Sequence, residues 1–93
     1  MLIESEKVLE RKLCAEIKKA GGWALKMLSS QVIGLPDRLC LLPGGRAYFV
    51  EVKSTGKKPT KIQLVIHKRL EALGFTVYVI DTTEKLTNFI KEI

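Results

Sequence analysis

The chain has 93 residues, which allows one domain spanning residues 1–93, and its hydrophobic share of 46% is ordinary for a folded protein. No apolar run reaches the roughly 20 residues that cross a membrane, and two cysteines with one histidine exclude a disulfide framework and a zinc site, which favours a reducing, cytoplasmic compartment. The formal net charge of +6 favours a polyanionic partner such as nucleic acid, although a solvated basic surface has the same composition.

Hydrophobic periodicity predicts seven elements of secondary structure. Three segments repeat apolar residues every three or four positions, as amphipathic helices do. Four shorter segments are apolar and are bounded by turn residues, as strands are. In chain order we expect a helix at 4–20, strands at 23–28, 37–42 and 46–53, a helix at 60–73, a strand at 75–81 and a helix from 83 onward. The order αβββαβα predicts an α/β fold class, with a small mixed α+β sheet flanked by helices.

The same pattern predicts which side chains form the core. The strand at 75–81 is a continuous apolar run, so we expect it to be buried on both faces. Trp23 is expected in the core rather than on a surface that stacks on bases. The second helix is expected to bury a stripe made of Ile62, Ile66, Leu70 and Leu73.

The residues that indicate chemistry lie on the two strands around Pro43-Gly44-Gly45. Glu51 and Lys53 share one face of their strand because side chains alternate with a period of two. If the connecting loop has three residues, Asp37 lies directly opposite Glu51, with the Cβ atoms about 5 Å apart. A two-residue Gly-Gly turn would place the carboxylates on opposite faces. The turn preference favours two residues, but the chemistry requires three, five or a bulge, and we expect the latter.

Two carboxylates at that separation repel each other unless a cation lies between them. An all-oxygen pair suits Mg²⁺, for which Mn²⁺ is expected to substitute, and the backbone carbonyl of Val52 is a further candidate ligand. Lys53 can reach an attacking water or a phosphate and offset the charge that develops there. The alternative is that Asp37 only begins a strand and that the other two form a solvated pair. Glu51 argues against it, because a carboxylate inside an apolar strand is costly to bury without a partner.

These features resemble the PD-(D/E)xK nuclease superfamily and, within it, the VRR-NUC domain family. The resemblance covers nearly the whole chain and implies an αβββαβ core that hydrolyses DNA with Mg²⁺ or Mn²⁺. It implies that Asp37, Glu51 and Val52 bind the metal and that Lys53 is the catalytic lysine. It is carried by four segments in the same order: Gly34-Leu35-Pro36-Asp37, Phe49-Val50-Glu51-Val52-Lys53, Gln63, and Gly74-Phe75-Thr76-Val77-Tyr78-Val79.

The resemblance also implies a Glu on the first helix and a Gln on the second. Glu10 matches the first best, because it lies beside the apolar face of its helix, and Glu6 on the same arc is the alternative. Gln63 matches the second, but Thr60-Lys61-Ile62-Gln63 also fits a capping box, in which Gln63 would only cap the helix. His67, one turn beyond Gln63, is expected to be a packing or surface residue.

A basic loop follows the strand that carries Glu51 and Lys53. Its lysines, together with Lys26 on the first strand, are candidate DNA-binding residues that would contact phosphates without reading sequence. A solubilising loop is the alternative reading. The loop lysines are Lys57, Lys58 and Lys61.

A single small domain has no further module that could read a base sequence, so a structure-selective endonuclease is the function that we expect. Stand-alone members of the resembled family, which are similar to phage proteins, imply a homodimer that cuts branched DNA such as four-way (Holliday) junctions. A twofold pair of sites suits paired cuts. The alternatives are a flap or restriction-type nuclease, a catalytically silent DNA-binding module, and an interaction subunit whose basic charge is incidental.

Overall fold

The computed structural model describes residues 2–93 and confirms the order αβββαβα. The four strands form one sheet in the order β1-β2-β3-β4, in which β3 and β4 are parallel and the other neighbours are antiparallel. No helix in this range is long and apolar enough to cross a membrane. The elements are α1 (Glu6–Lys19), β1 (Trp23–Lys26), β2 (Arg38–Leu42), β3 (Arg46–Val52), α2 (Lys61–Ala72), β4 (Val77–Ile80) and α3 (Thr83–Glu92).

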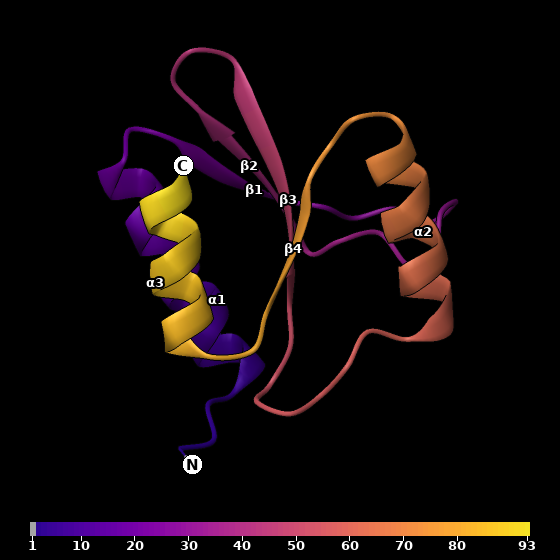
Figure 1. The fold of residues 1–93 in the computed structure, drawn as a ribbon, viewed down its shortest axis with the longest axis horizontal. Helices are drawn as coiled ribbons and strands as arrows, with labels where there is room; N and C mark the ends of the chain where they lie inside the picture. The colour runs from indigo at the N-terminus through magenta and orange to yellow at the C-terminus, as the bar shows by residue number, and fades with distance from the viewer. Residues whose placement is uncertain (1) are drawn as a thin grey trace.

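The helices cover the sheet unequally. Helices α1 and α3 lie on one face and α2 lies on the other (Figure 1). The core fills the α1–α3 side, where the helix residues Leu9, Leu13 and Ile17 are fully buried against Val50 and Val52 of β3. Each helix begins at a hydroxyl residue whose side-chain oxygen accepts a backbone N–H of the first turn, which satisfies a donor that the helix leaves unpaired. These caps are Ser5, Thr60 and Thr82.

The β2–β3 hairpin has the three-residue loop that the chemistry requires. Leu42 pairs with Arg46, and the register continues to Arg38 opposite Val50. Continued by one residue beyond the end of β2, this register places Asp37 opposite Glu51, on the face away from Arg38 and α1. Gly44 and Gly45 have φ values of +86° and +73°, a backbone conformation that residues with a Cβ rarely adopt. Because Leu42 pairs with Arg46, these two glycines belong to a three-residue loop with Pro43 rather than to a two-residue turn.

Strand β4 is not buried on both faces, so that expectation was wrong. It lies at the edge of the sheet beside β3. Val77, Tyr78 and Val79 are half-buried, and only Ile80 is fully enclosed. An edge strand after a crossover helix has one side open to solvent, so a continuous apolar run here does not mean burial on both faces.

The expected core of α2 and of β1 also differs from the structure. Ile62 and Leu73 are 48% and 71% exposed, and the buried residue of α2 is His67. Trp23 is 63% exposed, because β1 is the other edge strand and the residue stands at its start. The polar His67, which lies next to the predicted stripe, is the residue of α2 that the structure buries.

Candidate active site

The candidate site begins with Asp37, which is held at the entrance of β2. Its backbone oxygen accepts a hydrogen bond from the Met27 N–H at 2.9 Å, so the residue extends the β1–β2 ladder. Its side-chain Oδ2 accepts a hydrogen bond from the Val52 N–H at 2.7 Å. The carboxylate is therefore fixed across the hairpin against β3, beside Glu51.

Glu51 is buried under α2. It is 1% exposed, although it carries an ionisable group. Gln63 Nε2 donates to Glu51 Oε2 at 3.4 Å, and His67 Nε2 lies 3.3 Å from Glu51 Oε1. These contacts come from residues one helical turn apart on α2, so each carboxylate oxygen has its own partner.

The surroundings of Glu51 disfavour a bare negative charge. Burial and, next, the adjacent carboxyl of Asp37 raise the pKa of Glu51 to about 8. The charge of Lys53 lowers that pKa, and the charge of Glu6 raises it. A cation placed between the two carboxylates would reverse the balance and allow both to be ionised.

Lys53 follows Glu51 on the same face, as the period of two predicts. Its backbone N–H donates to Ile80 O at 2.9 Å, which continues the β3–β4 pairing past the end of β3. The positive charge of Lys53 lowers the pKa of Glu51. Burial lowers the pKa of His67; the charge of Glu71 opposes this shift, and the charge of Lys53 adds to it. The ammonium group therefore belongs to the same cluster as the two carboxylates.

Gln63 fulfils both of the roles that the sequence left open. Its Oε1 accepts the Thr60 N–H at 2.8 Å, and Thr60 Oγ1 accepts the Gln63 N–H at 3.3 Å, which is a capping box. Its Nε2 donates to Glu51. A side-chain amide has an acceptor and a donor, so the cap and the contact with the site use different atoms of one group.

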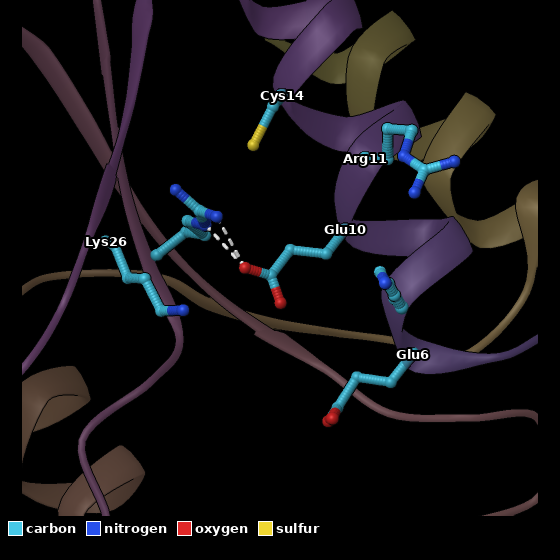
Figure 2. A pocket seen from close by; sticks show the side chains of 7 residues that line it. Glu6, Glu10, Arg11, Cys14 and Lys26 are labelled. Carbon is cyan, nitrogen blue, oxygen red and sulfur yellow. Dashed lines mark hydrogen bonds and ion pairs between the residues drawn. The ribbon is translucent and has the colours of Figure 1, made fainter.

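Glu10 and Glu6 have separate environments on α1. The Arg38 guanidinium donates to Glu10 Oε2 through Nη2 at 2.5 Å and Nε at 2.9 Å. Figure 2 shows the Glu10 side chain extending from the helix toward the guanidinium group that it binds, while Glu6 lies one turn earlier along the helix. Arg38 faces α1, whereas Asp37 and Glu51 face away from it. Glu6, rather than Glu10, is the α1 carboxylate whose charge acts on Glu51.

Lys26, a candidate DNA-binding residue, lies on the opposite face of the sheet from Asp37 and Glu51. It pairs with Arg38 across β1–β2, so its side chain leaves the sheet on the α1 side. There it lines a cavity of about 320 Å³ together with Glu6 and Glu10, and with the exposed cations Lys7 and Arg11 (Figure 2). The three loop lysines are solvent-exposed, and Lys58 lies in a second cavity beside Asp81 and Lys85; they are Lys57, Lys58 and Lys61.

The donor set fits a hard divalent cation. Within residues 2–93 no group of three or more His, Cys, Asp and Glu side chains could hold a metal ion. Mg²⁺ does not require one, because it usually binds one or two carboxylates, keeps several waters and takes phosphate oxygens. Asp37, Glu51 and the carbonyl of Val52 supply oxygen donors of this kind.

Sequence reasoning placed His67 on the right helix face but not in the site. The signal was its position one turn after Gln63, on the same face of α2. Glu6 was weighed only as an alternative, since both glutamates lie on one arc of α1. In each case the sequence showed the face of the helix but not the neighbouring residue from another element.

The chain was compared with known proteins. No protein-family model matches it. It is 45% identical over 84 residues to "Putative nuclease p44" of Acyrthosiphon pisum secondary endosymbiont phage 1, an alignment that covers 90% of each chain. A solved structure described as "VRR_NUC domain" matches with a TM-score of 0.83 and 30% identity, covering 95% of this chain and 97% of the other.

Proposed function

Because the chain belongs to the VRR-NUC domain family of nucleases, we propose that it is a metal-dependent endodeoxyribonuclease whose site is built from Asp37, Glu51 and Lys53. The observation that carries the proposal is the register of the β2–β3 hairpin. It sets the two carboxylates opposite each other on one face, next to a lysine, where a bound cation would offset the repulsion that raises the pKa of Glu51.

The reaction is hydrolysis of a phosphodiester, in which a water oxygen bonds to phosphorus and one P–O ester bond breaks. A bound Mg²⁺ ion would activate the water and offset the charge on the phosphate. Asp37, Glu51 and the Val52 carbonyl are the groups that would hold it. Lys53 orients the water and stabilises the negative charge that builds on the phosphate oxygens.

One residue of α1 and one residue of α2 complete this proposed site. Glu6 takes the place of the first-helix carboxylate, because Glu10 is engaged with Arg38. Gln63 donates a hydrogen bond to the Glu51 carboxylate and caps α2 at the same time. The exposed loop lysines contribute affinity for phosphates on either side of the cut, which makes binding depend on salt.

We further propose that the substrate is branched DNA and that the enzyme acts as a homodimer. A domain of this size buries most of its apolar side chains in one core, yet several on the α2 side remain exposed. Gly34 packs directly on Ile62, so the loop before β2 and helix α2 form one surface. Its exposed apolar residues are Leu28, Val32, Ile33, Ile62 and Val65. Such surfaces mark interfaces, and a twofold dimer would present two sites to a junction.

The test is a cleavage assay on a four-way junction and on linear duplexes of the same sequence. We expect Mg²⁺-dependent cutting that prefers the junction, none in EDTA, and none by Asp37→Asn, which should still bind DNA. Glu16→Gln, which alters a half-exposed carboxylate of α1 that pairs with Lys19, is the control and should cut normally. Wild-type rates from Asp37→Asn would refute the site. Equal cutting of duplex and junction, or a monomer in sedimentation at assay concentrations, would refute only the substrate or dimer proposal.

A further inference from the structure

Helix α2 is attached to the sheet in an unusual way. A surface helix normally buries an apolar stripe, but here the buried residue is His67. Of the stripe expected from the sequence, Ile66 and Leu70 are only half-buried, and Ile62 and Leu73 are 48% and 71% exposed. The helix therefore turns a polar group toward the sheet at the place where Glu51 emerges from β3.

The contacts of Glu51 account for that choice. His67 Nε2 lies 3.3 Å from Glu51 Oε1, and Gln63 Nε2 lies 3.4 Å from Glu51 Oε2. His67 is 5% exposed and Glu51 is 1% exposed, so solvent contributes little to either group. When Glu51 is ionised the ring nitrogen donates, and the two α2 residues fix the rotation of the carboxylate about its last torsion.

We propose that His67 is a positioning residue that holds Glu51 in the orientation required to bind a divalent cation, an inference that rests on the function proposed above. A carboxylate that ligates a metal is itself hydrogen-bonded, and loss of such a partner typically weakens metal binding 10- to 100-fold. Without His67, the buried Oε1 loses its partner, and the side chain is free to turn away from Asp37.

The competing explanation is that His67 only fills space between α2 and the sheet. Three substitutions separate the two explanations. His67→Leu keeps a side chain of similar bulk without a hydrogen-bond donor. His67→Gln restores an amide N–H near the position of Nε2, whereas His67→Asn has the same amide on a shorter side chain that does not reach Glu51. Leu64→Ala, which alters an exposed residue of α2 outside the proposed dimer surface, is the control.

The test measures Mn²⁺ binding to the free protein by calorimetry, together with thermal unfolding in EDTA. We expect His67→Leu and His67→Asn to raise the Kd for Mn²⁺ about 10-fold or more, and His67→Gln and Leu64→Ala to stay close to wild type. A space-filling role predicts the opposite order for Leu and Gln. If His67→Leu does not fold, the Asn and Gln variants still decide the question.

The outcomes distinguish this inference from the proposed function. If the wild type binds Mn²⁺ and Asp37→Asn does not, the metal site stands. An unchanged Kd in His67→Leu and His67→Asn, or an equal loss in the Gln variant, then overturns the role of His67 alone. If the wild type does not bind Mn²⁺, or Asp37→Asn binds it equally well, the metal site itself is refuted, and the inference falls with it.

Discussion

Replacing Glu51 with Gln should stabilise the metal-free protein while destroying its activity. The folded-state pKa of Glu51 is raised from 4.5 to about 8 by burial and by Asp37. A carboxyl with a raised pKa contributes stability that is fully present below its unfolded pKa and is lost as the pH rises through its folded pKa. The wild type should therefore lose stability from this group between about pH 4.5 and pH 8.

The size of the effect follows from the width of that window. At pH 7 the unfolded chain gains about 3 kcal/mol by ionising Glu51, at about 1.4 kcal/mol per pKa unit, and the folded protein gains almost none of it. Gln does not ionise, so Glu51→Gln avoids this loss. The amide oxygen of the glutamine introduced at position 51 can still accept a hydrogen bond from Gln63. Its amide nitrogen can donate to the His67 ring when the ring is in its other tautomer. For a domain of this size, a stabilisation of about 3 kcal/mol corresponds to a rise of about 10 to 20 °C in Tm.

The assay is thermal unfolding of the wild type, Glu51→Gln and Glu16→Gln in EDTA from pH 4.5 to pH 8. The advantage of Glu51→Gln over the wild type should grow with pH, and Glu16→Gln should show no such trend. Adding Mg²⁺ at pH 7 should narrow the gap, because a ligand stabilises only the folded state that binds it. The reasoning is refuted if the advantage of Glu51→Gln is independent of pH or if the variant is the less stable protein at pH 7.

Three further predictions concern the groups around the carboxylates. Lys53→Ala should lower the cleavage rate of bound substrate on the order of 100-fold or more, measured in single turnover, whereas an unchanged rate with weaker binding would make Lys53 a phosphate anchor. Replacing Lys57 and Lys58 with Ala should reduce the slope of log affinity against log salt by about 1.8, as two lost phosphate contacts predict; an unchanged slope in filter binding would remove the loop from the interface. Glu6→Gln should weaken Mn²⁺ binding with little effect on Tm, whereas Glu10→Gln should cost about 1 to 3 kcal/mol through its contacts with Arg38 and leave Mn²⁺ binding nearly intact. The reverse order would return Glu10 to the site.

The hairpin that aligns the site could be predicted from residue parity. Asp37 and Glu51 share a face only if the loop contains an odd number of residues or a bulge. The local preference of Gly44-Gly45 for a two-residue turn pointed the other way. The structure shows a three-residue loop, in which both glycines have positive φ. The requirement that the two carboxylates pair was the better guide, because it constrains the register of two whole strands. The turn preference of Gly-Gly concerns only the four residues of the turn.

The order of strands and the burial of α2 could not be predicted in the same way. Periodicity identifies a strand but does not say whether it ends at the centre or at the edge of the sheet. The run at Val77–Ile80 follows a crossover helix and lies at an edge, so all of its side chains except that of Ile80 are only half-buried. The same limit applies to His67, whose burial depends on Glu51 from a different element.

The choice between Glu6 and Glu10 depends on distance along the helix rather than on its face. The two residues are one turn apart, about 6 Å along the axis, and lie on the same arc. Which one reaches Glu51 depends on where α1 begins relative to the end of β3. Arg38, which binds Glu10, comes from β2, and no spacing within α1 reveals it.

The most direct test of the central claim is the position of Mn²⁺ in a crystal of the wild-type protein, located by its anomalous scattering. The ion should lie between Asp37 and Glu51, with the Val52 carbonyl among its ligands, and should be absent from crystals of Asp37→Asn grown in the same way. A well-occupied Mn²⁺ ion bound elsewhere, for example between Glu6 and Glu10, with none between Asp37 and Glu51, would contradict the site.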